Sequence, residues 1–124
     1  MADTFKNAGV DLTTTDPTTL YTVPTAAPGI TGTPPIFPTT AVIKSIIVCN
    51  DSASATEYTI EWTDTSATAA YKITNDKTIA TDTTYEVLSQ PLVLEESDLI
   101  KITANAANEI HITVSILEIT KGDL

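Results

Sequence analysis

The chain has 124 residues, about one domain's worth, and 42% of them are hydrophobic, which is enough for a single core. Its 16 acidic residues outnumber six lysines, arginine is missing, and the formal net charge is −10. Because contacts to phosphates and base edges depend on Arg and Lys, this composition argues against direct binding to nucleic acid. The same charge argues against binding to an anionic membrane.

The composition favours β-strands throughout. Threonine occurs 25 times, and together with Ile and Val it makes the chain rich in β-branched residues, which suit strands. No stretch of 11 or more residues shows a clean helical period of 3.6. We therefore expect an all-β fold, either an antiparallel β-sandwich or a jelly-roll-like barrel.

The first 40 residues differ from the remainder. They contain six of the seven prolines and three of the four glycines. Proline removes a backbone donor and fixes φ, so this region is unsuited to a helix or a central strand. The sequence predicts an extended N-terminal Pro/Thr-rich arm over residues 1–40, with one short strand at Thr19–Val23, and a β-sandwich domain over residues 41–124. A disordered tail is the alternative for the arm. Residues 1–10 contain no apolar run, so no secretory signal is expected.

The segment Ala41–Asn50 is apolar on both faces of a predicted strand. Regular alternation places Val42, Ile46 and Val48 on one face and Ile43, Ile47 and Cys49 on the other. Such a strand is covered on both sides, either by a second sheet and the arm or by another subunit. We therefore expect a homo-oligomer, with part of Val42–Cys49 or the arm at the interface.

The rest of the chain reads as a series of short strands separated by turn signals every 8–12 residues. This spacing is typical of a sandwich or a closed barrel. In the final strand, Ile110 to Ile119, apolar side chains at 110, 112, 114 and 116 alternate with polar ones at 111, 113 and 115, which indicates a half-buried strand. The other predicted strands are residues 57–64, 70–74, 78–81, 84–88, 92–95 and 99–104. The expected core residues are Ile46, Val48, Ile60, Trp62, Leu94, Ile100, Ile102, Ile112, Val114 and Ile116.

Few residues in this sequence suggest chemistry. Cys49 is the single cysteine, and no local motif joins it to His111, the single histidine. Glu109 is a conceivable oxygen ligand beside His111, and a metal site would need further partners at ligand spacing. An exposed or interface histidine is the alternative that we favour. The sequence therefore predicts no catalytic, cofactor-binding or metal-binding residues, and no enzyme activity.

Acidic and aromatic residues offer three further candidates. Glu95, Glu96 and Asp98 form an acidic turn, which either holds a hard cation such as calcium or lets Asp98 accept hydrogen bonds from nearby backbone donors. Glu57, Glu61 and Glu86 are conceivable paired carboxylates or simply solvated side chains. Trp62 with Tyr58 and Ile60 forms either a sugar platform or, as we expect, part of the core.

Several motifs together resemble a group of small virion structural proteins of tailed bacteriophages. They are LYTVP at 20–24, AVIKSIIVCND at 41–51, the EYTIEWTD strand, and PLVLEESDLIKITANAANEIHITVSILEI at 91–119. The short glycine-containing link that usually joins the first two motifs is here stretched into PTAAPGITGTPPIFPTT. The resemblance implies a β-sandwich and a homo-oligomer, often a trimer, located in the virion.

Two functions are compatible with this resemblance. The first is a capsid decoration or cement protein, made in the host cytoplasm, which binds the major capsid protein at the capsid surface and stabilises the head. The second is a β-sandwich binding module of a tail or fibre. For the first function, the residues expected to contact partners through the arm and the interface are Ile30, Ile36, Phe37, Val42, Ile43 and Ile47.

Overall fold

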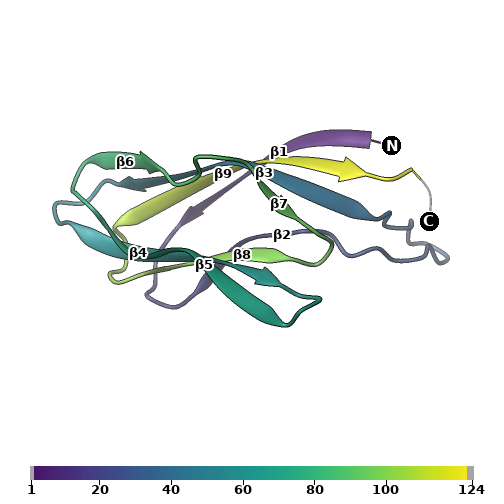
Figure 1. Cartoon of the computed structure of the whole chain (residues 1–124), viewed down its shortest axis with the longest axis horizontal. Helices are drawn as coiled ribbons and strands as arrows, with labels where there is room; N and C mark the ends of the chain where they lie inside the picture. The colour runs from purple at the N-terminus through teal and green to yellow at the C-terminus, as the bar shows by residue number, and fades with distance from the viewer. Residues whose placement is uncertain (1, 123–124) are drawn as a thin grey trace.

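A computed structural model describes residues 2–122 as two packed antiparallel β-sheets (Figure 1). No helix occurs among these residues, and hence none that could cross a membrane. The expected all-β sandwich is confirmed. The strands are β1 (Ala2–Asp11), β2 (Thr18–Thr22), β3 (Thr39–Asn50), β4 (Thr56–Asp64), β5 (Ala69–Ile79), β6 (Thr83–Glu86), β7 (Leu92–Leu94), β8 (Leu99–Ala104) and β9 (Ile110–Thr120).

The chain crosses repeatedly between the two sheets. Sheet A has the order β1-β9-β3-β6, and β7 also pairs with β3; sheet B has the order β2-β8-β4-β5. Strand β1 is therefore one edge of sheet A, and β2 and β5 are the two edges of sheet B. The start of β1, the end of β9 and the start of β3 lie at one end of the sandwich (Figure 1).

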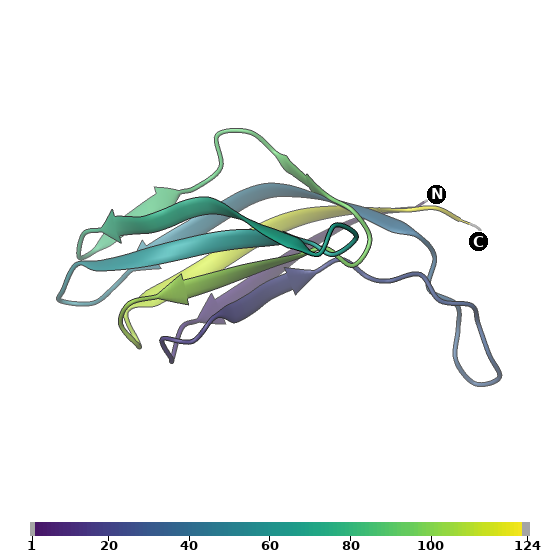
Figure 2. The ribbon, with the colours of Figure 1, turned by 60° about the horizontal axis from the view of Figure 1, so that its bottom comes forward.

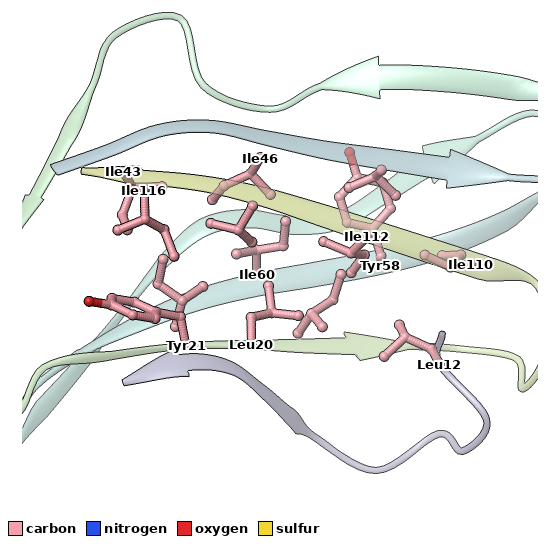
Figure 3. Packing of buried hydrophobic residues seen from close by; sticks show 14 of the residues in the cluster. Leu12, Leu20, Tyr21, Ile43, Ile46, Tyr58, Ile60, Ile110, Ile112 and Ile116 are labelled. Atoms are coloured by element: carbon pink, nitrogen blue, oxygen red, sulfur yellow. The ribbon is translucent and has the colours of Figure 1, made fainter. Parts of the chain in front are cut away.

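The core lies between the inner faces of the sheets (Figure 3). Residues at alternate positions of β9 and β8 point inward, as period-two alternation requires. Nine of the ten expected core residues are buried, and Trp62 is half-buried while packing against the core. The sequence missed the contributions of Leu12, Leu20 and Val23, which are also buried.

Strand β3 contains a bulge that changes which residues point inward. Ile43 is opposite Ile116, whereas Ser45 is opposite Ser115, so Lys44 is an extra residue on β3. The odd-numbered Ile43 is buried before the bulge, and the even-numbered Ile46 is buried after it. The predicted grouping of Val42 with Ile46, and of Ile43 with Ile47, is therefore wrong, because it assumed unbroken alternation.

Glu86 of β6 compensates for the irregular backbone at this bulge. Its carboxylate accepts hydrogen bonds from the Ser45 hydroxyl, from the Ile46 N–H at 2.9 Å and from the Leu88 N–H at 3.2 Å. The backbone of Val87 also donates to the Ile46 carbonyl at 2.9 Å. Glu86 therefore has a structural role on the outside of the sandwich, which the solvated-carboxylate interpretation did not include.

The expectation of an arm over residues 1–40 is not confirmed. Strand β1 pairs with β9 without interruption from Ala2↔Thr120 to Asp11↔His111, and β2 pairs with β8 in the other sheet. The region thus holds two strands of the sandwich where one short strand was predicted. The extended, proline-rich part is limited to residues 23–38.

Strand β5 joins two predicted short strands into one. The predicted turn at Asn75-Asp76 lies within it, where the pairing with β4 is irregular. Asp76 has a φ of 47°, and its N–H donates to the Thr59 hydroxyl at 2.9 Å. Asn75 and Asp76 form a bulge and not a turn, because the segment after them continues to pair with β4.

Candidate interaction surface

Exposed apolar side chains form a row across the outer face of sheet A. The strand registers place Phe5 opposite Leu117, Leu117 opposite Val42, and Val42 opposite Val93. We call these four residues the outer row. Phe5 is 76% exposed and Val93 is 58% exposed, whereas Leu117 and Val42 are half-buried. Opposing residues of an antiparallel sheet share a face, so the outer row is continuous across β1, β9, β3 and β7.

A hollow of about 550 Å³ lies beside the outer row. It is lined by Phe5, Asn7, Lys44, Ser45 and Ser115, among others. Asn7, Ser115 and Ser45 are opposite one another in the next row of the sheet, and their side chains are short. The hollow therefore results from a row of small residues next to the bulky Phe5.

The proline-rich segment forms a hairpin that projects from the sandwich (Figure 2). Ala27 and Ile36 exchange two backbone hydrogen bonds of 2.9 Å each, and Ile30 and Thr33 exchange bonds of 3.0 and 2.9 Å. Between the latter two, Gly32 has a φ of +82°, as the third residue of a type II turn requires. Residues 27–36, which we call the hairpin, thus have a defined conformation.

The base of the hairpin is held by the turn between β7 and β8. The N–H of Val23 donates to the Asp98 carbonyl at 2.9 Å, and the N–H of Ala26 donates to the Glu96 carboxylate at 3.0 Å. The hydroxyls of Thr25 and Ser97 are 2.5 Å apart. These contacts fix where the hairpin leaves the sandwich.

The acidic turn itself is a structural element. Asp98 is buried, and its carboxylate accepts hydrogen bonds from the backbone N–H groups of Thr65 at 3.1 Å and Glu95 at 2.9 Å. This confirms the expectation that Asp98 satisfies nearby backbone donors. No group of three or more His, Cys, Asp or Glu side chains in residues 2–122 is arranged to hold a metal ion.

Of the six residues predicted to contact partners, five are at least partly exposed and one is buried. Ile30 is 70% exposed on the hairpin, Ile36 is 45% exposed, and Phe37 is half-buried. On β3, Ile47 and Val42 lie on the outer face. Ile43 is fully buried in the core and cannot contact a partner, because the bulge at Lys44 turns it inward.

The structure brings Cys49 and His111 together, although no sequence motif joins them. They are opposite each other on β3 and β9. The two ring nitrogens of His111, however, lie 3.3 Å from an Asp11 carboxylate oxygen and 3.8 Å from one of Asp51. Because both nitrogens face carboxylates, the imidazole is not arranged as a base for the thiol.

A buried polar cluster between the sheets was missed by the sequence analysis. The Tyr21 hydroxyl donates to Glu118 at 2.5 Å, and the Lys6 ammonium lies 3.4 Å from the same oxygen. Burial, followed by the hydrogen bond and the negative charge of Glu118, raises the pKa of Tyr21 above its usual value. Glu118 continues the inward phase of Ile112, so a charge at an apolar position was the available signal.

No family model matches the chain, and no curated protein matches it. A chain in the T13 viral particle of infectious bursal disease virus aligns with a TM-score of 0.52 at 10% identity, over 97% of this chain and 31% of its own length. A chain of Bacillus endospore appendages, described as disulfide-linked pili, gives 0.48 at 16% identity over 95% and 88%. This chain spans under a third of the virus protein. The first likeness supports the fold alone.

Proposed function

We propose that this chain is a virion structural protein that binds the outside of a tailed-phage head and stabilises the shell, with the major capsid protein as its partner. The observation that carries the proposal is the placement of its exposed apolar side chains. Among residues 2–122, four of the seven exposed large hydrophobic residues lie on these two surfaces, Ile30 and Ile36 on the hairpin and Phe5 and Val93 in the outer row. Exposed apolar surface of this kind suits contact between proteins. The phage-like sequence motifs support the same function.

The hairpin is the proposed anchor. Ile30 is next to the turn at its tip and is largely exposed. Fully burying an isoleucine side chain contributes roughly 1.5–3 kcal/mol. The prolines at 28, 34 and 35 and the cross-hairpin hydrogen bonds limit the conformations of the unbound hairpin. The entropy lost on binding is therefore small.

Stabilisation of the shell follows from mass action. A protein that binds the assembled shell, and does not bind dissociated subunits, favours the assembled state in proportion to its occupancy. Many copies with modest contacts suffice, and no catalytic group is required. The proposed location is the capsid surface, after synthesis in the host cytoplasm.

Binding to undecorated heads tests the proposal. The chain is mixed with heads lacking it, the heads are sedimented, and bound protein is quantified over a range of concentrations. Ile30→Ser should weaken binding at least about tenfold, because the lost burial exceeds about 1.4 kcal/mol. Thr31→Ser, at the same turn, is the matched control and should bind as the unchanged chain does.

A second variant replaces residues 28–35 with a short Gly-Ser link. Because Ala27 and Ile36 are already adjacent, the sandwich should keep its thermal stability while head binding is lost. If both variants bind heads as tightly as the unchanged chain, the hairpin mechanism is wrong. If the intact chain never binds heads but binds tails, the tail or fibre function replaces this one.

A further inference from the structure

The strand edges of this sandwich differ in how they are protected against pairing with another chain. In sheet B, β2 has five residues, contains a bulge and is followed within two residues by Pro24, and β5 is irregular at two points. In sheet A, β6 and β7 have four and three residues. Short, bulged or proline-flanked edges are the usual protection against edge-to-edge association.

Strand β1 has none of these features. It is ten residues long, contains no proline, and pairs with β9 in unbroken register. Alternate peptide groups of an edge strand point away from the sheet and are available to an added strand. Among residues 2–122, no backbone hydrogen bond outside the β1–β9 pairing involves residues 2–11. Lys6 is the only lysine of β1, and it forms an ion pair with Glu118 and therefore does not protect the edge.

We propose that β1 pairs antiparallel with β1 of a second copy of this chain, which joins the two copies of sheet A into one continuous sheet. The pairing is two-fold, with Phe5 opposite its own symmetry mate. The outer rows of the two copies then meet at Phe5 and become a single apolar row. Phe5, the most exposed large hydrophobic residue of those described, is covered in the pair.

Charge permits a second copy in this register and opposes the two neighbouring registers on its C-terminal side. With Phe5 at the centre, Asp3 is opposite the partner's Asn7, and Thr4 is opposite the partner's Lys6, so no like charges oppose each other. Shifting the centre to Lys6 puts two lysines opposite each other, and shifting it to Asn7 puts Asp3 opposite the partner's Asp11. Like charges directly opposite destabilise a strand pair. The chain as a whole carries −10, but residues 2–8 carry one Asp and one Lys. This segment can therefore pair with itself despite the acidity of the whole chain.

Disulfide trapping tests both the pairing and its register. In a Cys49→Ser background, Phe5→Cys places two cysteines directly opposite, at a Cα separation of about 5 Å, which a disulfide can span. Asn7→Cys, on the same strand and face, is the matched control. Its two copies are four residues out of register, about 14 Å apart at ~3.4 Å per residue. Under mild oxidation we expect a covalent dimer from Phe5→Cys, and none from Asn7→Cys.

Light scattering on the unlinked chain provides the second readout. The unchanged chain should show a concentration-dependent mass approaching twice 13.2 kDa. Phe5→Lys places like charges opposite each other and should raise the dimer dissociation constant at least about tenfold. Asn7→Lys meets the partner's Asp3 and should keep the dimer.

A monomer at tens of micromolar, equal trapping at both cysteine positions, or a mass three times that of the chain overturns the inference. The last result would instead agree with the trimer that the phage resemblance implies. The experiments contain no heads, so their failure leaves the head-binding proposal untouched, and failed head binding leaves the dimer untouched.

Discussion

The hydroxyl of Tyr58 is the clearest target for a stability prediction. The side chain is fully buried between the sheets (Figure 3), and no hydrogen-bond partner for its hydroxyl oxygen occurs among residues 2–122. Burial of a polar group without a partner carries its full desolvation cost. Tyr58→Phe keeps the ring and its packing and removes that group. We therefore expect the variant to be more stable than the unchanged chain.

The expected gain is about 1–3 kcal/mol, the cost of one unsatisfied buried polar group. For a domain of this size, 1 kcal/mol corresponds to roughly 3–5 °C in Tm. Urea unfolding followed by Trp62 fluorescence measures the free energy, and the slope with urea should not change because the surface exposed on unfolding is the same. An unchanged or lowered midpoint would refute the reasoning that the hydroxyl lacks a partner.

The pH dependence of unfolding gives an independent check. Burial first, and then the charge of Tyr85, raises the pKa of Tyr58 from 10.0 to about 12. Between these two pH values the folded state keeps the Tyr58 proton, whereas the unfolded state releases it. The free energy of unfolding of the unchanged chain therefore falls between about pH 10 and 12, and this group causes no such loss below pH 10. Tyr58→Phe removes this loss, and the advantage of the variant should widen over that interval.

Tyr21→Phe is the matched control, because its hydroxyl does have a partner. Removing the 2.5 Å hydrogen bond to buried Glu118 should cost about 1.5–3 kcal/mol, the range for a bond to a charged group. The same substitution thus has opposite signs at two positions of one core. If both variants shift stability in the same direction, hydrogen-bond satisfaction does not decide the effect.

Three further predictions concern the bulge and the hairpin. Glu86→Ala should lower the free energy of unfolding by about 1 kcal/mol in a urea titration, whereas Glu86→Gln, which keeps an acceptor for the bulge, should cost less. Asp98→Ala leaves two backbone N–H groups without their acceptor and should lower the free energy of unfolding by about 3 kcal/mol. Proteolysis within residues 24–38 should also become faster in this variant. Unchanged cleavage would argue against anchoring of the hairpin by the turn between β7 and β8. Gly32→Ala meets no neighbouring atom but is strained at φ +82°, so hydrogen exchange at the Ile30 and Thr33 amides should accelerate by about fivefold while Tm stays constant.

Period-two alternation predicted the strands whose inner and outer faces differ most in polarity. The final strand and the strand around Ile60 were found because each has one apolar face against the core. Strand β1 was not predicted, since ADTFKNAGVD has few apolar residues and forms a strand because β9 supplies its hydrogen bonds. Such an edge strand leaves little hydrophobic pattern in the sequence.

Only part of the candidate surface was predicted from the sequence. Exposure of Ile30 and Ile36 follows from their place between prolines, where the chain cannot enter the sheet. Ile43 was misplaced because a bulge is defined by the partner strand, and Lys44 looks like any other residue of the segment. Phe5 and Val93 were missed because the outer row exists only once four distant strands are paired.

Electron cryomicroscopy of heads incubated with the purified chain tests the central claim most directly. The account predicts density for the β-sandwich at regular positions on the outside of the shell, with the hairpin, residues 27–36, in contact with capsid subunits. Heads without added density, or density confined to the tail, would contradict it.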